Sequence, residues 1–196
     1  MIFRRLATAA VMALSACCAG LAFATPPLPP QAAPGDLIFR QGTENVSQLV
    51  QAVDRGDFSH VGMLVGRPGQ WQVLHATPSE RPGQADAVVL DSLDFFLDAQ
   101  RARAYRLYQV AADPGTRERA VAWAMAQQGK PFQLQGDAQD LYCTTLVWQA
   151  WQQGGMDLGV VFTKVELPVL GGLYLLPGKL LLSSRLRPLT PLLSLR

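Results

Sequence analysis

Three side chains in this sequence could together carry out nucleophilic chemistry: Cys143, His60 and His75. A thiolate is a strong nucleophile, and a neutral imidazole within hydrogen-bond reach can remove the thiol proton. The chain contains only two histidines, and both lie in one short region. Taken singly, a free cysteine is most often a small buried residue, and a histidine is often structural. The combination therefore depends on the elements that position the three side chains.

Both histidines fall in a predicted β-hairpin. Residues 61–65 and 72–76 are apolar and rich in β-branched side chains, and a Gly-Arg-Pro-Gly turn sequence separates them. Successive side chains of a strand point to opposite faces, so the pairing register decides whether the two rings share a face. If paired residue numbers have an odd sum, His60 and His75 are opposite or diagonal on one face, whereas an even sum separates them. We expect a shared face.

Cys143 falls in the first turn of a helix predicted from Asp140 to Gln153. Val147 and Ala150 follow it at i+4 and i+7, which places the thiol on the side that packs inward, toward the sheet. The N–H groups and the positive dipole at a helix start favour a thiolate. The backbone N–H at this position would also supply half of an oxyanion hole.

The remaining pattern predicts a mixed domain. Short strands are expected at 36–39, 88–90 and 105–110. Helices are expected at 46–53, where an apolar stripe should pack on the sheet, after the cap Ser92, and from Asp113 to Gly129. Because the short strands mostly follow one another, we expect an α+β fold rather than a doubly wound sheet.

Composition limits the class of protein. The 196 residues are 49% hydrophobic and 16% charged, which excludes a disordered chain and suits one domain. The net charge is +2, with no dense run of lysine or arginine, so the sequence offers no electrostatic basis for binding nucleic acid.

Residues 1–24 are expected to be a signal peptide. Two arginines precede an apolar run that ends in a small-residue cleavage site at 22–24. Residues 14–17 offer an alternative, because they resemble a lipobox and cleavage there would leave a lipid-modified Cys17. Cleavage after residue 24 leaves Cys143 as the one thiol, so no internal disulfide can form. We expect a periplasmic or secreted protein, with a lipoprotein anchored through Cys17 as the alternative.

The two ends of the mature chain differ from its centre. Residues 25–34 are rich in proline and alanine and are predicted to be an extended linker, so that a single domain covers 35–196. Residues 165–196 are rich in leucine but interrupted by prolines, and no apolar run there is long enough to span a bilayer. This segment either wraps the core or exposes an apolar surface for peripheral membrane or lipid contact.

Several sequence blocks resemble the circularly permuted branch of the NlpC-type, papain-like superfamily, and within it the YiiX/YebB-like group of exported proteins. In chain order the blocks are Gly35-Asp36-Leu37-Ile38-Phe39, Phe58-Ser59-His60-Val61-Gly62-Met63, Val73-Leu74-His75-Ala76, Gly129-Lys130-Pro131-Phe132 and Tyr142-Cys143. The resemblance extends from residue 35 to about residue 151 and does not cover the tail. It implies a permuted papain-like fold with a small antiparallel sheet packed against helices.

The resemblance also implies roles. Cys143 matches the nucleophile, His60 matches the general base, and His75 falls at the third, orienting position. Many relatives carry Glu at that position, and the lecithin retinol acyltransferase branch carries His. A neutral histidine can fix the tautomer of His60, but it stabilises an imidazolium less than a carboxylate does. Thr144-Thr145 stands where some relatives have Ser-Glu, so any role of that Glu is unfilled.

The implied activity is hydrolysis of amides through a thioester, and in an exported protein the implied substrates are cell-wall peptides. A lipid acyl hydrolase or acyltransferase and a non-catalytic binding module are the alternatives. We expect no cofactor and no metal. A zinc site made by Cys143, His60 and His75 is the less favoured possibility, because no Cys-x-x-Cys or His-Glu-x-x-His spacing is present.

Overall fold

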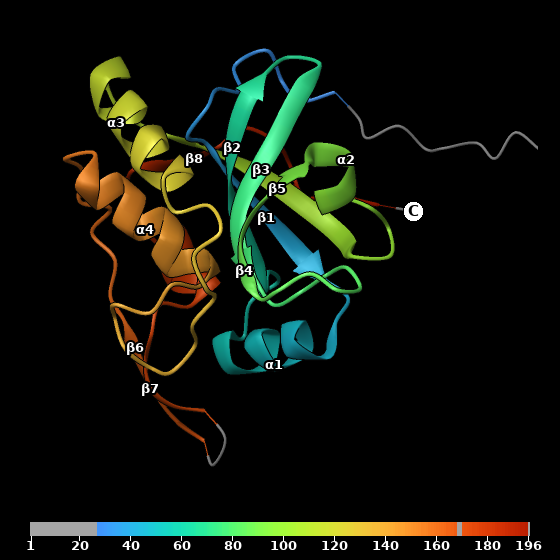
Figure 1. Ribbon diagram of the computed structural model, residues 1–196. Helices are drawn as coiled ribbons and strands as arrows, with labels where there is room; N and C mark the ends of the chain where they lie inside the picture. Colours follow the sequence, from blue (N-terminus) through green and yellow to red (C-terminus); the bar gives the residue numbers. More distant parts are fainter. Residues whose placement is uncertain (1–26, 168–169, 196) are drawn as a thin grey trace, which may run out of the picture.

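The computed structural model describes residues 27–167 and 170–195 (Figure 1). Over these residues the chain forms a seven-stranded antiparallel sheet in the order β4-β3-β2-β1-β5-β8, with β9 also paired to β5. Its strands are β1 (Leu37–Gly42), β2 (His60–Arg67), β3 (Gln70–Thr77), β4 (Ala87–Ser92), β5 (Ala102–Val110), β8 (Leu186–Pro188) and β9 (Leu193–Ser194). The helices are α1 (Asn45–Asp54), α2 (Leu93–Phe96), α3 (Pro114–Met125), α4 (Cys143–Gln153) and α5 (Pro177–Leu181), and β6 (Thr163–Leu167) pairs with β7 (Leu170–Tyr174) in a separate hairpin.

The sheet separates two apolar layers. Helices α3 and α4 lie side by side against one face, on the left in Figure 1, while the short helix α2 lies on the other side. Val61 and Met63 of β2 belong to the core beneath α4, together with Leu146. The opposite face carries Leu64, which packs with Phe96 of α2. This α+β architecture agrees with the sequence-based prediction.

Helix α4 begins three residues later than expected. The carboxylate of Asp140 accepts hydrogen bonds from the backbone N–H groups of Gln135 and Asp137, at 2.5 and 3.1 Å, and so closes a loop before the helix. Tyr142 is still extended, and Cys143 is the first helical residue.

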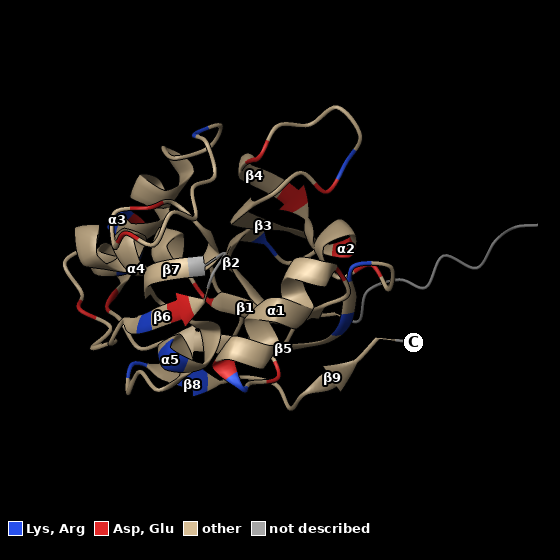
Figure 2. Cartoon of the chain, turned by 90° about the horizontal axis from the view of Figure 1, so that it is seen from below, with Lys and Arg blue, Asp and Glu red and all other residues tan. Residues whose placement is uncertain are grey.

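Helix α1 forms where it was predicted, but its apolar stripe does not pack on the sheet. Val46 and Leu49 are 43% and 38% exposed. The C-terminal end of the helix is held instead by Asp54, whose carboxylate accepts the backbone N–H of Gly178 at the start of α5 (2.5 Å). Figure 2 shows α1 free of charged residues until that end. The expectation for this helix was wrong because sequence periodicity gives the direction of an apolar stripe, not what the stripe faces.

Parts of both end segments pack against the body of the domain. Residues 25–34 were expected to be an extended linker, yet Leu28 and Ala32 of this segment pack against the apolar layer that contains α2. Leu180 and Leu186 of the tail are buried, whereas Leu182 is 77% exposed. None of the described helices is long and apolar enough to cross a membrane. The predicted signal peptide and its lipobox alternative lie outside the described residues.

The Gly-Asp block at the start of β1 fastens the helical layer to the sheet. Asp36 is fully buried and pairs with Arg117 of α3 at 2.8 Å. The same guanidinium donates to the carbonyls of Pro34 and Val110. Gly35 has a φ of 91°, and a Cβ there would lie 3.2 Å from the ring of Trp151 on α4. This block is therefore structural.

Removing one partner of this pair should destabilise the fold. We expect Arg117→Met to lower the free energy of unfolding by about 3 kcal/mol, because it leaves a carboxylate buried without its cation. Urea denaturation would measure the change. Lys164→Ala is the control, since Lys164 and Glu166 are 72% and 73% exposed and such pairs contribute little. Equal stability of Arg117→Met and the wild type would contradict the assignment.

Candidate active site

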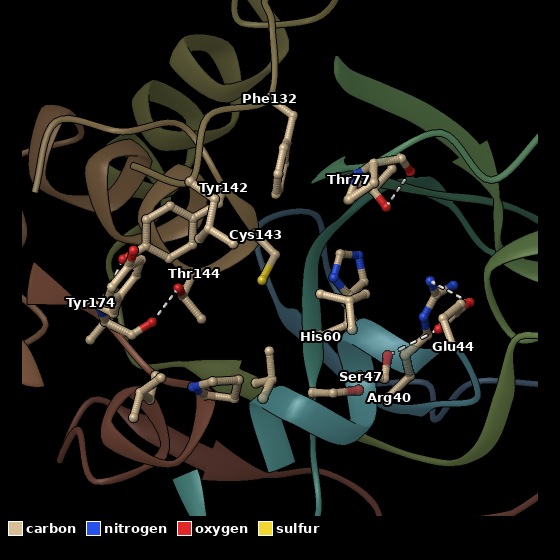
Figure 3. Close-up of a pocket in the computed structure, with 18 of the residues that line it drawn as sticks. Arg40, Glu44, Ser47, His60, Thr77, Phe132, Tyr142, Cys143, Thr144 and Tyr174 are labelled. Atoms are coloured by element: carbon tan, nitrogen blue, oxygen red, sulfur yellow. Dashed lines mark hydrogen bonds and ion pairs between the residues drawn. The ribbon is translucent and has the colours of Figure 1, made fainter. Parts of the chain in front are cut away.

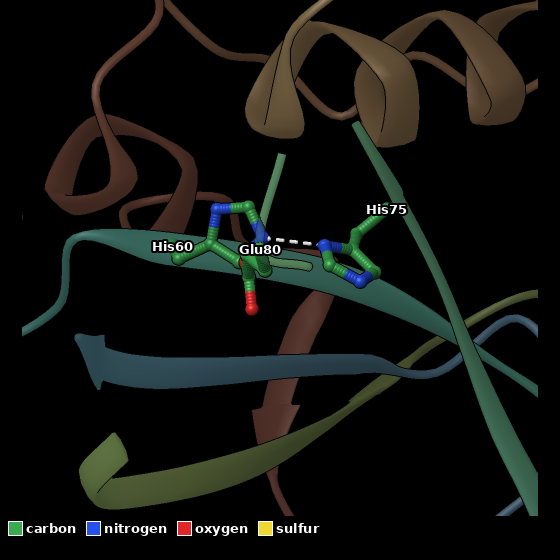
Figure 4. Close-up of side chains that lie close together, drawn as sticks. All are labelled: His60, His75 and Glu80. Atoms are coloured by element: carbon green, nitrogen blue, oxygen red, sulfur yellow. Dashed lines mark hydrogen bonds between the residues drawn. The ribbon is translucent and has the colours of Figure 1, made fainter. Parts of the chain in front are cut away.

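The two histidines share one face of the sheet, as expected. Met63 of β2 lies opposite Leu74 of β3, which is an odd register and makes His60 and His75 diagonal neighbours. Nε2 of His60 lies 2.8 Å from Nδ1 of His75, and the rings are nearly perpendicular (Figure 4). Both imidazoles are buried. The predicted hairpin thus brings the only two histidines of the chain into direct contact.

Gly62 leaves room for the close approach of β2 and β3 that brings the two histidines together. A Cβ at position 62 would lie 2.3 Å from Cγ1 of Val73 and 3.2 Å from both Cβ of His75 and the carbonyl of Leu74. A side chain at this position would therefore push β3 and its histidine away from β2.

We accordingly expect Gly62→Ala to lower amide hydrolysis by about tenfold to a hundredfold, because small displacements at a reacting site have effects of that size. Turnover of the purified variant is the measurement. Gly69→Ala is the matched control, since Gly69 is in the same hairpin and a Cβ there meets nothing within 4 Å. Because Gly69 has a φ of 80°, an alanine there is mildly strained. This control therefore measures the effect of backbone strain in the hairpin without a displacement of His75. Equal activity of the two variants would contradict this explanation.

An aspartate that was not predicted from the sequence is hydrogen-bonded to His75. Oδ2 of Asp91, on β4, lies 3.0 Å from Nε2 of His75, and Oδ1 accepts from Nη1 of Arg81 at 2.5 Å. Asp91 is only 3% exposed. The available signal was an acidic residue directly after the apolar run 87–90, in a strand that pairs with the histidine strand.

A second buried charge pair lies beside the histidines and was also missed. Arg40 of β1, opposite His60, is 2% exposed and pairs with Glu80. Its guanidinium also donates to the carbonyl of Phe96 and lies over that ring, 4.5 Å from the centroid. Glu80 accepts from the hydroxyl of Thr77 as well. Arg40 therefore places a fixed positive charge next to His60.

Cys143 reaches the site from the other side of the sheet. Because α4 packs on the face of the sheet that carries Val61, the thiol does not lie over the opposite face, which carries the two histidines. Instead Cys143, as first residue of α4, lies at the end of β2, where His60 begins the strand. Both residues line one pocket of about 250 Å³, and the sulfur points into it (Figure 3). Among the described residues the two are not hydrogen-bonded, as is common before a substrate closes a site.

The residues next to Cys143 hold the helix start in place. The hydroxyl of Thr144 donates to the carbonyl of Leu175 at 2.5 Å, and that of Thr145 donates to the carbonyl of Asp140 at 2.7 Å. The phenolic oxygen of Tyr142 accepts the backbone N–H of Leu175 at 2.7 Å. Both threonines thus have structural contacts at positions where some relatives carry Ser-Glu.

Burial determines the charge states at the site. Loss of solvent raises the pKa of the Cys143 thiol to about 11, although backbone N–H groups of Val61 and Thr144 oppose the shift. Loss of solvent also lowers the pKa of His60 well below its usual range, and the positive charge of Arg40 adds to this. The resting pair is therefore neutral thiol and neutral imidazole. The thiolate expected from the helix start is not the resting form, because desolvation outweighs the effect of the helix end.

This charge state predicts how the thiol reacts with pH. The rate of alkylation by iodoacetamide should be low at pH 7 and rise about tenfold per pH unit up to at least pH 10, because only the thiolate reacts. The rate measured on folded and on urea-unfolded protein gives the comparison, since an exposed thiol titrates near pH 8.5. A plateau of fast alkylation below pH 7 in the folded protein would show a preformed thiolate instead.

Comparison with known proteins identifies the family. A family model described as "permuted papain-like amidase enzyme, YaeF/YiiX" matches residues 31–168, which include all three predicted site residues. The chain belongs to this family. No curated protein matches the sequence significantly. Membership makes the chain a papain-like cysteine amidase, in agreement with the resemblance found in the sequence.

A solved structure shows the same fold. The crystal structure of the metalloprotein YiiX from Escherichia coli superposes with a TM-score of 0.66 at 20% identity, and the match covers 81% of this chain and 96% of YiiX. The permuted papain-like fold is therefore confirmed for this amidase.

The lining of the amidase pocket has a polar and an apolar part. Cys143, His60 and Arg40 all contribute to this lining. The apolar part is formed by the stripe of α1 that does not pack on the sheet, with Val46, Val50 and Val53, and by side chains from the facing loops, including Phe132 and Leu134. Helix α1, the blue-green helix at the bottom of Figure 3, thus forms a wall of the pocket.

Proposed function

We propose that Cys143 is the nucleophile of this amidase, that His60 is its general base, and that His75 orients His60. One observation carries the proposal: Nε2 of His60 is hydrogen-bonded to His75, while the ring of His60 lines the same pocket as the thiol of Cys143. Nδ1 of His60 is then the nitrogen that can accept the thiol proton.

The mechanism follows from the neutral resting pair. When the substrate carbonyl enters between thiol and imidazole, Nδ1 of His60 takes the proton of Sγ as the sulfur attacks the carbonyl carbon. The N–H groups of the first turn of α4 have no partner within the helix, and that of Cys143 stabilises the developing oxyanion. His60 then returns the proton to the leaving amine. Water attacks the thioester, releases the acid and restores the thiol.

Direct detection of the thioester tests this proposal. An activated 4-nitrophenyl ester with a short acyl group is mixed with the enzyme, the reaction is quenched in acid, and peptide mass spectrometry locates the acyl group. We expect one acyl group on Cys143 and loss of the label on treatment with neutral hydroxylamine. An acyl group found only on other side chains would overturn the proposal.

An exported cysteine amidase of this family would act on peptides of the cell wall, and this is our first proposal for the substrate. The apolar wall contributed by α1 favours a second candidate, an amide or ester of an apolar acyl chain, because polar stem peptides gain little from such a surface. Release of amines from wall peptides and of fatty acid from phospholipid vesicles, measured in parallel, distinguishes the two.

We also propose that residues 1–24 direct export, giving a periplasmic or secreted enzyme, and that the exposed leucines of the tail make peripheral contact with membranes. The exposed Leu173 and Leu182 support the second point. Fractionation of cells that produce the full chain would test export. Replacement of Cys17 by Ser would show whether lipid anchoring contributes.

The description of YiiX as a metalloprotein raises the question of a metal here. His60, His75 and Glu80 have ligand atoms within 4.8 Å of one another (Figure 4). These groups do not fit a metal, however, because His60 and His75 are hydrogen-bonded to each other and Glu80 is paired with Arg40. A dication would break these contacts and lie next to the buried guanidinium. The mechanism above therefore uses none, and retention of activity after dialysis against EDTA is the expected result.

A further inference from the structure

We propose that Asp91 is a positioning residue of the reaction: it decides which ring nitrogens of His75 and His60 carry protons, and it stabilises the positive charge that the two rings take up during acyl transfer. This inference rests on the proposed roles of Cys143 and His60. It concerns a residue on β4 that lies two hydrogen bonds away from the base.

The proton positions follow from counting donors and acceptors. Both oxygens of the Asp91 carboxylate are acceptors, and Oδ1 is already bonded to Arg81. Oδ2 can only accept, so Nε2 of His75 must carry a proton, and Nδ1 of this neutral ring must be an acceptor. Nε2 of His60, at 2.8 Å, must then be the donor. Nδ1 of His60 is left without a proton, which is the form that a general base requires.

The opposite arrangement would disable the site. If Nε2 of His75 lacked a proton, its Nδ1–H would donate to Nε2 of His60, and the proton of His60 would lie on Nδ1. That nitrogen could no longer accept the proton of Cys143. The carboxylate excludes this arrangement because it has no proton to donate to His75. Its pKa is lowered: burial alone would raise it, but the hydrogen bonds from His75 and Arg81 outweigh that effect.

Asp91 also gives the positive charge a favourable location. Arg40 disfavours an imidazolium at both rings, but at His75 the carboxylates of Asp91 and Glu80 oppose this effect. As Nδ1 of His60 accepts the thiol proton, its Nε2 proton can pass to Nδ1 of His75. His60 is then neutral, and His75 is an imidazolium paired with the Asp91 carboxylate. The same transfers run backwards when the amine leaves, so the proton count balances. Asp91 thereby supplies, one residue further away, the carboxylate that position 75 lacks.

Phe96 keeps this chain of hydrogen bonds dry. Its ring lies 5.7 Å from the ring of His60 and 5.0 Å from that of His75, and it is fully buried. Hydrogen bonds between buried groups are stronger than those in water, and an unsatisfied member is costly. The proton position that Asp91 fixes on His75 therefore also fixes the proton position on His60, without competition from water.

Asp91→Asn is the test, because an amide has only one acceptor oxygen. With Arg81 present, that oxygen faces the guanidinium and the NH₂ group donates to Nε2 of His75, which reverses both tautomers. We expect kcat/KM to fall on the order of 10⁴-fold, as in the catalytic triad in which an amide replaces the carboxylate behind the histidine. The ring nitrogens report the cause directly. Because the chain has two histidines, imidazole-labelled ¹⁵N spectra contain four ring signals, and both rings should change from Nε2–H to Nδ1–H.

Two further variants keep the test decisive. Arg81→Met/Asp91→Asn frees the amide oxygen to accept from His75, so we expect the original tautomers to return and kcat/KM to recover at least tenfold over Asp91→Asn. Asp94→Asn, exposed on the neighbouring α2, should match the wild type in both measurements. Unchanged tautomers in a folded Asp91→Asn variant would overturn the proposal, whatever its activity. The spectra are read without substrate, so loss of the proposed function of Cys143 would show separately, in the acylation experiment.

Discussion

Cys143→Ser is expected to reduce amide hydrolysis on the order of 10⁵-fold or more, because removal of a nucleophile from a unit of cooperating groups has effects of that size. The hydroxyl is smaller than the thiol and far harder to ionise, and the buried site that raises the thiol pKa to about 11 disfavours an alkoxide even more. Turnover of the best amide substrate found, followed over hours, is the measurement.

Gln152→Ala is the matched control for this variant. Gln152 is exposed on the same helix, α4, so its loss leaves the active site intact. Thermal unfolding of both variants should match that of the wild type. Retention of more than a hundredth of the activity by Cys143→Ser would show that another group is the nucleophile.

His60→Ala is expected to reduce hydrolysis on the order of 10⁴-fold or more, while alkylation of Cys143 at pH 10 stays within about threefold of the wild type. The two effects separate because the neutral imidazole is needed as a base in turnover, whereas alkaline solvent can ionise the thiol without it. Activity assays and iodoacetamide kinetics on the same preparation measure both.

Gln72→Ala, exposed on the same hairpin, provides the comparison for this result. Equal loss of turnover and of alkaline alkylation in His60→Ala would mean that the imidazole holds the thiol as an ion pair.

Since a His60 with a pKa well below 6.5 remains a base in mild acid, the wild type should also keep its kcat/KM down to pH 6.5. A fall in kcat/KM already above pH 7 would contradict the same charge assignment.

The local elements of the protein were predictable because their signals are local. The hairpin that carries His60 and His75, the capped helix after Ser92 and the α+β class of the domain follow from periodicity and turn residues within short windows. The order of the blocks around Cys143 also indicated the permuted papain-like family, which the family match confirms. The sequence left two kinds of strand register open for the hairpin, with an odd or an even sum of paired residue numbers. The structure has an odd sum.

The surroundings of those residues depended on tertiary structure. Packing between distant segments decides which face of the sheet α4 covers, and therefore that Cys143 shares a pocket with His60 at the end of β2. The same is true of the pocket wall made by α1 and of the packing of residues 27–34. Periodicity defines an apolar stripe, but long-range contacts choose its partner.

Charge was the property that sequence reasoning judged least well. The position of Cys143 at a helix start predicted a thiolate, yet burial reverses that preference, and burial depends on how the whole chain folds around the thiol. Asp91 was overlooked for the same reason, because its meaning comes from the register that places β4 beside β3. The sequence by itself determined which groups could react and on which elements they lie, since those depend on residue type and local spacing. Only the tertiary structure decided their protonation and their partners, because both depend on solvent exclusion and on contacts between residues far apart in the chain.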